Sequence, residues 1–189
     1  MRKLIQERIK SSIEVKNRLL HDETVMEGIV DLASRIVASI QQGGKVLFFG
    51  NGGSASDAQH LACEFVVKLK DDRRPLPALA LTVNTSILTA AANDYSFEAV
   101  FSRQVEALGK KGDIAIGIST SGNSSNVIAA LASARKKGLV TVVLTGQSGG
   151  AISGTVDIEI KVPSDVTAHI QEAHILIGHI LCELVEKNL

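Results

Sequence analysis

Five short apolar runs, separated by longer amphipathic segments, constrain the fold more than any other feature of this sequence. The runs occupy residues 45–50, 78–83, 113–118, 139–144 and 156–162 and are bounded by Gly, Asp, Pro or Ser. Such runs are typical of fully buried parallel strands. Segments 54–69, 97–108 and 123–137 are long enough to be crossover helices between them. The alternation predicts an α/β fold, a three-layer sandwich with a five-stranded parallel sheet, flanking helices and right-handed crossovers.

Two further helices are predicted before the first strand, over residues 3–20 and 24–42. Gly43 and Gly44 follow the second helix, where a helix C-cap commonly places glycine. Apolar side chains recur along the first segment as a stripe that the sheet cannot wholly cover, namely Ile5, Ile9, Ile13, Leu19 and Leu20. We therefore expect one domain over residues 1–189, with an N-terminal helical arm (1–42) used for self-association and an α/β core (43–189).

Composition excludes several classes of protein. The 189 residues include 45% hydrophobic residues, enough for a sizeable core, and 20 basic residues balance 20 acidic ones. Without a basic stripe, nucleic acid is a poor candidate partner. No apolar stretch reaches spanning length and the charged N-terminus does not fit a signal peptide, so we expect no membrane partner and a cytoplasmic location. Cys63 and Cys182 are too few for a disulfide framework, and we expect both to be buried in helices.

Two polar loops follow predicted strands at the edge where open parallel sheets bind ligands. The first runs through Asn51, Gly52, Gly53 and Ser54. The second carries four hydroxyls before a helix, on Ser119, Thr120, Ser121 and Ser124. Free N–H groups at a helix start, together with hydroxyl donors, suit a phosphomonoester. The alternative is that these serines merely cap a helix. Neither loop matches the dinucleotide or nucleotide P-loop pattern, which disfavours NAD and ATP.

Histidine and glutamate residues supply the candidate reactive groups. His60 and Glu64 are spaced i,i+4 on the helix behind the glycine turn, which places an imidazole beside a carboxylate as an acid, base or metal-ligand pair. His179 lies among apolar residues and needs a polar partner; a satisfied core histidine is the alternative. His174 cannot point the same way as His179, because five residues turn a helix through about 500°. His169 is expected to be exposed.

Four segments together resemble the sugar isomerase (SIS) family, and within it the phosphoheptose isomerases. They are Phe49-Gly50-Asn51-Gly52-Gly53-Ser54-Ala55-Ser56-Asp57-Ala58-Gln59-His60, Ala92-Asn93-Asp94-Tyr95, Gly117-Ile118-Ser119-Thr120-Ser121-Gly122-Asn123-Ser124 and Ile170-Gln171-Glu172-Ala173-His174-Ile175-Leu176-Ile177-Gly178-His179. The resemblance implies a cytoplasmic homotetramer that interconverts sedoheptulose 7-phosphate and D-glycero-D-manno-heptose 7-phosphate through an enediol. That reaction is the first step towards the ADP-heptose of bacterial lipopolysaccharide.

The resemblance also implies roles for individual residues. Glu64 would move a proton between C1 and C2, with His179 as its acid/base partner. One Zn²⁺ per subunit would be held by His60, Glu64, Gln171 and His179. The implied substrate contacts are Asn51, Gly52, Gly53, Ser54, Glu64, Asn93, Asp94, Ser119, Thr120, Ser121, Ser124 and Gln171. Whether helices from different subunits must meet to complete the site stays open at this point.

Two departures and two rival functions qualify the resemblance. His169 and Lys68 stand where relatives often carry Arg, which affects expected substrate affinity more than reaction type. The nearest rival is a non-catalytic SIS relative that binds the replication initiator DnaA, but that relative lacks the histidine matching His179. A sugar-phosphate sensor of the kind found in transcription regulators would need a DNA-binding domain, for which 189 residues leave no room.

Overall fold

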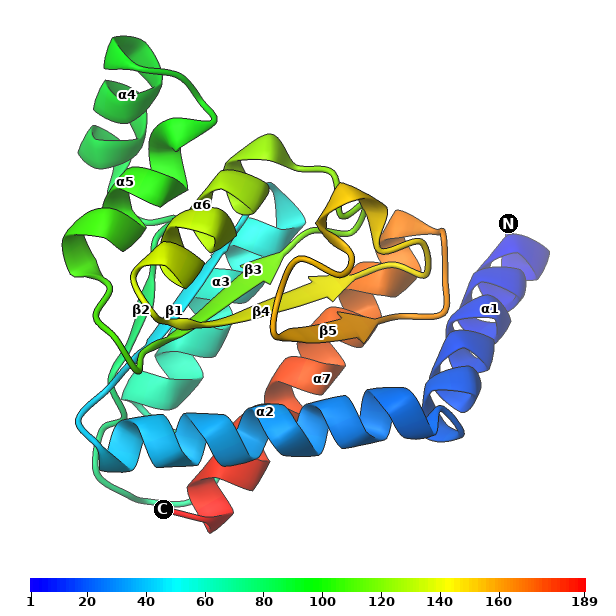
Figure 1. Cartoon of the computed structure of the whole chain (residues 1–189). Coiled ribbons are helices and arrows are strands. Elements are labelled where there is room, and N and C mark those ends of the chain that lie inside the picture. Colours follow the sequence, from blue (N-terminus) through cyan, green and yellow to red (C-terminus); the bar gives the residue numbers. More distant parts are fainter.

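A computed structural model describes all 189 residues, arranged as helices on both faces of one sheet (Figure 1). The strands are β1 (Val46–Gly50), β2 (Ala78–Ala80), β3 (Ile114–Ile118), β4 (Val140–Thr145) and β5 (Ile158–Lys161). The helices are α1 (Arg2–Leu20), α2 (Glu23–Gln41), α3 (Gly53–Val66), α4 (Thr85–Asp94), α5 (Ala99–Leu108), α6 (Ser125–Lys136) and α7 (Thr167–Lys187), with a 3₁₀ turn, η1 (Gly150–Ile152).

The sheet has the strand order β2-β1-β3-β4-β5, and every neighbouring pair is parallel. Chain order reverses at β1, so the crevice beyond the carboxyl ends of β1 and β3 is the topological switch point of the sheet. Gly50 pairs in register with Ile118, and the two loops that follow these strands therefore start side by side. The predicted fold class is confirmed, and its ligand-binding edge carries both polar loops.

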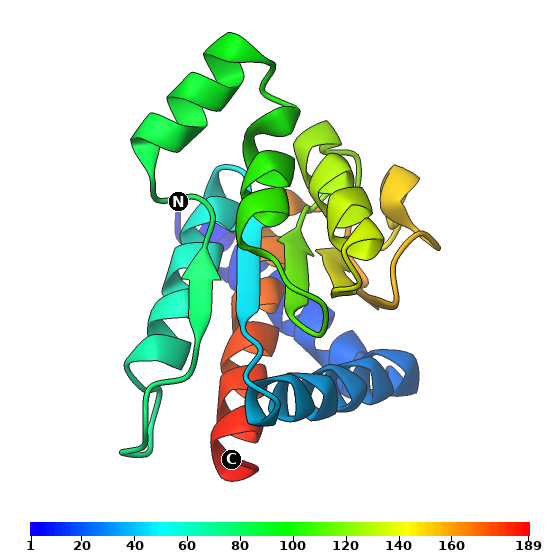
Figure 2. The same ribbon diagram turned by 60° about the vertical axis from the view of Figure 1, so that its left-hand side comes forward.

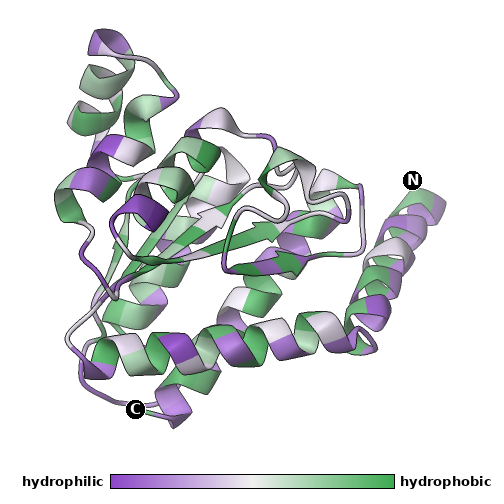
Figure 3. Ribbon diagram, in the orientation of Figure 1, coloured by the Kyte–Doolittle hydropathy of each residue, from purple (hydrophilic) through white to green (hydrophobic).

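Two hydrophobic clusters hold the layers together. The larger joins one face of the sheet to α1, α2, α3 and α7, and the smaller joins the other face to α4, α5 and α6. Figure 2 shows helices on both sides of the sheet, and Figure 3 shows the apolar colouring of its strands. Residues of β1 and β3 are buried throughout, as the continuous apolar runs predicted.

Helix α4 and the turn η1 were not predicted from the sequence. Asn84 caps α4 by accepting a hydrogen bond from the Ile87 N–H, but Ala91 is the only buried residue of the helix. A short helix with one buried position lacks the 3.6-residue apolar pattern that identifies helices in a sequence. The second predicted strand is also shorter than expected, because only Ala78–Ala80 pair with β1 and Val83 is exposed.

The N-terminal arm shows the expected exposed stripe with one correction. Leu4, Ile5, Ile9 and Ile13 are each more than half exposed, whereas Leu19 is buried against the core. Figure 1 shows α1 standing at the edge of the molecule. The division into arm and core stays a prediction, because α2 shares the hydrophobic cluster of the sheet. No helix has both the length and the apolar composition needed to cross a membrane.

Candidate active site

The two polar loops at the switch point are tied together by side-chain amides. Asn51 and Asn126 exchange hydrogen bonds, with donor–acceptor distances of 2.8 Å and 2.9 Å. Gly52 adopts φ +56°, a left-handed conformation that glycine takes at little cost, and the chain then enters α3. Ser54, in the first turn of α3, is buried. The Asn51–Asn126 hydrogen bonds thus attach the loop after β1 to the first turn of α6, the helix that follows the serine loop.

The serine loop borders a polar cavity of about 240 Å³. Within the loop, the hydroxyl oxygens of Ser119 and Ser124 lie 3.0 Å apart. The cavity is lined by one apolar and nine other residues: Thr120, Ser121, Asn123, Gly146, Gln147, Ser148, Ser164, Asp165, Thr167 and Ile170. Hydroxyls, amides and the helix starts around them can donate several hydrogen bonds to one phosphate. Of the four hydroxyl residues predicted for the anion site, Thr120 and Ser121 line this cavity, whereas Ser119 and Ser124 do not.

Sequence reasoning missed the part of this cavity that follows β4 and β5. Gln147 and Ser148 come directly after β4, and Asp165 and Thr167 come after β5. The carboxyl ends of β4 and β5 lie at the same edge of the parallel sheet as those of β1 and β3. The tendency of ligands to bind beyond strand carboxyl ends therefore points to these residues as well.

His60, Glu64 and His179 form the reactive cluster. His60 Nε2 lies 2.9 Å from His179 Nε2 and 3.3 Å from Glu64 Oε1. Because two N–H groups cannot face each other, one ring donates through Nε2 and the other accepts. His60 and Glu64 lie on α3 and His179 on α7, so the cluster bridges two helices. His60 is the polar partner that His179 was expected to need, and His179 is half-buried at the cluster rather than part of the core.

The donor set of this cluster fits a divalent metal ion. One ligand atom from each of the three residues lies within 4.8 Å of the other two. Two imidazoles and a carboxylate form a common protein ligand set for Zn²⁺, and tetrahedral ligands at about 2.0–2.1 Å from the ion lie about 3.3 Å apart. His60 Nε2 and Glu64 Oε1 are already that far apart. The Nε2 atoms of His60 and His179 would have to move only slightly further apart.

The fourth predicted ligand, Gln171, lies elsewhere on this chain. Its side-chain amide is packed against Gly53 at the start of α3, in the space that a Cβ on that glycine would occupy. Gln171 precedes His179 by eight residues, a distance of about 12 Å along a helix. The structure therefore places Gln171 beside the glycine turn and the polar cavity, away from the His–Glu cluster.

Two predicted substrate residues lie apart from both polar regions. Asn93 Nδ2 donates to Asp94 Oδ1 at 2.8 Å, and both side chains are exposed at the end of α4. Asp94 borders a separate, mainly apolar pocket between α4 and α5 with Tyr95 and Arg103. Neither residue lines the serine-loop cavity.

The remaining histidines and cysteines divide between core and surface. His174 is buried, with Nε2 at 3.2 Å from the carbonyl oxygen of Thr145, and burial lowers its pKa to about 4. It turns away from the cluster, as predicted. His169 is buried and not exposed, because the first turn of α7 packs against the body of the protein. Cys182 is buried as expected, whereas Cys63 is exposed on α3.

A family model and several known proteins match the sequence of this chain. A family model described as SIS domain matches residues 12–146. The phosphoheptose isomerase of Clostridium acetobutylicum is 50% identical over 189 residues, covering 100% of this chain and 96% of the relative. That of Roseiflexus sp. is 54% identical over 181 residues, covering 96% and 91% respectively. The chain belongs to the phosphoheptose isomerase family of SIS domains.

Solved structures of phosphoheptose isomerases share the whole fold. That from Francisella tularensis superposes with a TM-score of 0.94 at 39% identity, covering 98% of this chain and 97% of the other. That from Neisseria gonorrhoeae gives 0.92 at 40% identity, covering 98% of each chain. The protein is thus an isomerase by family.

Proposed function

We propose that this phosphoheptose isomerase family member interconverts sedoheptulose 7-phosphate and D-glycero-D-manno-heptose 7-phosphate, as the first step of ADP-heptose biosynthesis. The observation that carries the proposal is the meeting of His60, Glu64 and His179 across α3 and α7. An aldose–ketose isomerisation needs a base for one carbon-bound proton and a second group for the oxygen-bound protons. The cluster supplies both kinds of group in one place.

In the proposed reaction, Glu64 removes the proton from C1 of the ketose and returns it at C2. His179 moves the proton between the two oxygens, so the enediol is formed and consumed without free charge. His60, Glu64 and His179 would hold one Zn²⁺ per subunit, with Gln171 from a second copy of the chain as the fourth ligand. When bound, the ion would act as a Lewis acid that polarises the carbonyl group and stabilises negative charge that develops on the substrate oxygens.

The phosphate end of the substrate is assigned to the switch-point loops. Ser119, Thr120, Ser121 and Ser124 supply hydroxyls, and Ser54 lies at the start of α3 nearby. Asn51, Gly52, Gly53 and Gln171 border the same region and are assigned to the sugar. Asn93 and Asp94, exposed on α4, are proposed to reach the substrate only in the assembled enzyme.

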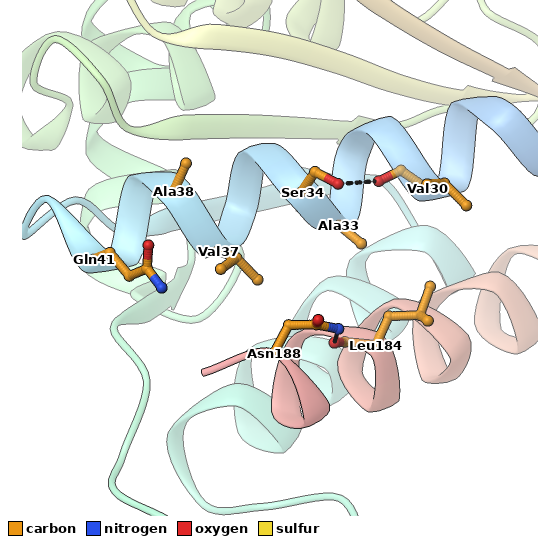
Figure 4. A pocket seen from close by; sticks show the side chains of 8 residues that line it. All are labelled: Val30, Ala33, Ser34, Val37, Ala38, Gln41, Leu184 and Asn188. Carbon is orange, nitrogen blue, oxygen red and sulfur yellow. Dashed lines mark hydrogen bonds between the residues drawn. The ribbon is translucent and has the colours of Figure 1, made fainter.

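Assembly into a cytoplasmic homotetramer is part of the proposal. On one chain, about 12 Å of α7 separates Gln171 from His179, so a second copy of the chain would have to bring its own Gln171 to the cluster. Two exposed apolar features support such contacts. One is the stripe on α1, and the other is a groove of about 450 Å³ between α2 and α7, which Figure 4 shows. It is lined by Val30, Ala33, Ser34, Val37, Ala38, Gln41, Leu184 and Asn188.

No observation favours the DnaA-binding alternative. The relatives and structures described above are all named as isomerases, and the histidine that distinguishes the enzyme from the assembly factor is present as His179.

The experiment that tests the proposal follows the conversion of sedoheptulose 7-phosphate by NMR, with wild-type protein before and after treatment with a chelator. Turnover that the chelator abolishes and Zn²⁺ restores supports both the reaction and the metal. Turnover that survives complete metal removal supports the isomerase reaction and shows that the reaction does not need Zn²⁺. No turnover by a folded, zinc-loaded protein overturns the proposed function.

A further inference from the structure

The reacting groups lie on two helices, so their geometry depends on how these helices are held together. Helices α3 and α7 run in the same direction, because Gly53 meets Gln171, His60 meets His179 and Leu61 meets Gly178. The Leu61–Gly178 contact is apolar and therefore not directional. Sliding of one helix along the other would change the distance between His60 and His179.

A nearly buried ion pair joins α7 to the loop that follows α3. Arg73 Nε donates to Glu186 Oε1 at 3.0 Å, and Nη2 lies 2.9 Å from the same oxygen. The side chains are 12% and 1% exposed. Arg73 lies in the charged, proline-containing segment 70–77, where no local sequence pattern marks a buried arginine. Fork-shaped guanidinium contacts fix direction as well as distance.

Arg73 also holds the catalytic segment of α3 through its backbone. Nη2 donates to the carbonyl oxygen of Glu64 at 2.8 Å, and Nη1 donates to that of Phe65 at 2.9 Å. These carbonyls belong to the last turn of α3, which ends at Val66 and has no intrahelical partner for them. The guanidinium thus contacts the backbone of the proposed base directly.

Glu186 connects this cap to the proposed acid/base partner. It follows His179 by seven residues, which is two turns to within about 20°, so both side chains leave the same face of α7. Glu186 also accepts the backbone N–H groups of Leu69 at 2.9 Å and Lys70 at 3.3 Å. Burial opposes its ionisation, but these donors and Arg73 outweigh burial and keep the pKa of Glu186 below its usual range.

We propose that Arg73 and Glu186 are positioning residues, which set the register of α3 against α7 and thereby hold Glu64 and His60 at the correct distance from His179. The expected effect on kcat rests on the proposed function, whereas the expected effect on Co²⁺ binding depends only on the geometry of His60, Glu64 and His179. A displacement of about 1 Å at a reacting group can cost about 10²-fold in rate.

The test compares Arg73→Lys, Arg73→Ala and Glu186→Gln with the matched control Lys70→Ala. Lys70 joins the same loop to the same helix through Glu183, but this pair is 60% and 32% exposed. We expect the Arg73 and Glu186 variants to lower kcat by about 10-fold or more with little change in KM, and to weaken Co²⁺ binding at the cluster by about 10–100-fold. Arg73→Lys, which keeps one cation but loses the fork, should lie between wild type and Arg73→Ala.

Both readouts are taken at a temperature where circular dichroism shows every variant folded, and Co²⁺ is followed by its visible spectrum. Folded variants that are less stable but keep wild-type kcat and Co²⁺ affinity would overturn the inference, as would equal losses in Lys70→Ala. If wild-type protein does not isomerise the substrate, the proposed function fails, and the Co²⁺ affinities alone decide the positioning role. If Arg73→Ala does not fold, Arg73→Lys and Glu186→Gln provide the comparison.

Discussion

At the scale of single residues, the proposed chemistry depends on three side chains that converge from two helices. Glu64→Gln keeps the size of the side chain and a hydrogen-bonding oxygen but removes the base, and His179→Gln removes the proton carrier. We expect each variant to lose about 10²-fold or more in kcat, because general acid or base groups contribute about 10²–10⁴-fold. Initial rates on sedoheptulose 7-phosphate measure the loss. His21→Gln, exposed in the turn between α1 and α2, is the control; equal losses in all three variants would contradict the assignment.

A second residue-scale prediction concerns His174, which burial holds neutral. Its pKa falls from 6.5 to about 4, so between these values the unfolded chain binds a proton that the folded protein does not. Stability is therefore lost as pH falls through this window, by roughly 3 kcal/mol in full. Denaturant unfolding at pH 7 and pH 4.5 should show a smaller loss for His174→Gln than for wild type. If wild type and His174→Gln lose the same free energy of unfolding between pH 7 and pH 4.5, His174 does not cause the loss.

At the scale of elements, the close approach of α3 and α7 depends on a glycine. A Cβ on Gly178 would collide with the side chain of Leu61. We expect Gly178→Ala to separate the helices, cost about 1–3 kcal/mol of stability and weaken Co²⁺ binding at the cluster. Gly154→Ala is the control, because a Cβ at Gly154 would meet no other atom within 4 Å; the φ of +73° at Gly154 adds backbone strain. Unchanged Co²⁺ affinity in a destabilised Gly178→Ala protein would show that the helices separate without moving the cluster.

The elements also show what the sequence could and could not predict. Buried strands and long crossover helices were found because their apolar runs are continuous, and the serine loop was found because hydroxyls gather before a helix. Helix α4 was missed because it buries only Ala91. The pairing of His60 with His179 spans more than 100 residues, and it was expected only through the family resemblance. The equally distant pairing of Arg73 with Glu186 was not expected, because no local pattern encodes such a contact.

At the scale of the whole molecule, the proposed tetramer makes activity depend on assembly. Ile5→Asp with Ile9→Asp places charges on the exposed stripe of α1, where neither side chain supports the core. We expect lower mass by light scattering and activity that rises with protein concentration, because charged groups are not readily desolvated in an apolar contact. Glu7→Asp, elsewhere on α1, is the matched control. A dissociated double variant with full activity would contradict the need for assembly.

The most direct test of the central claim is NMR of the wild-type, zinc-loaded protein with sedoheptulose 7-phosphate in D₂O. The account predicts D-glycero-D-manno-heptose 7-phosphate as product, with deuterium at C2 wherever the proton held by Glu64 exchanges with solvent. Glu64→Gln should give neither product nor deuterium. A folded wild-type protein that leaves the substrate unchanged and free of deuterium would contradict the account.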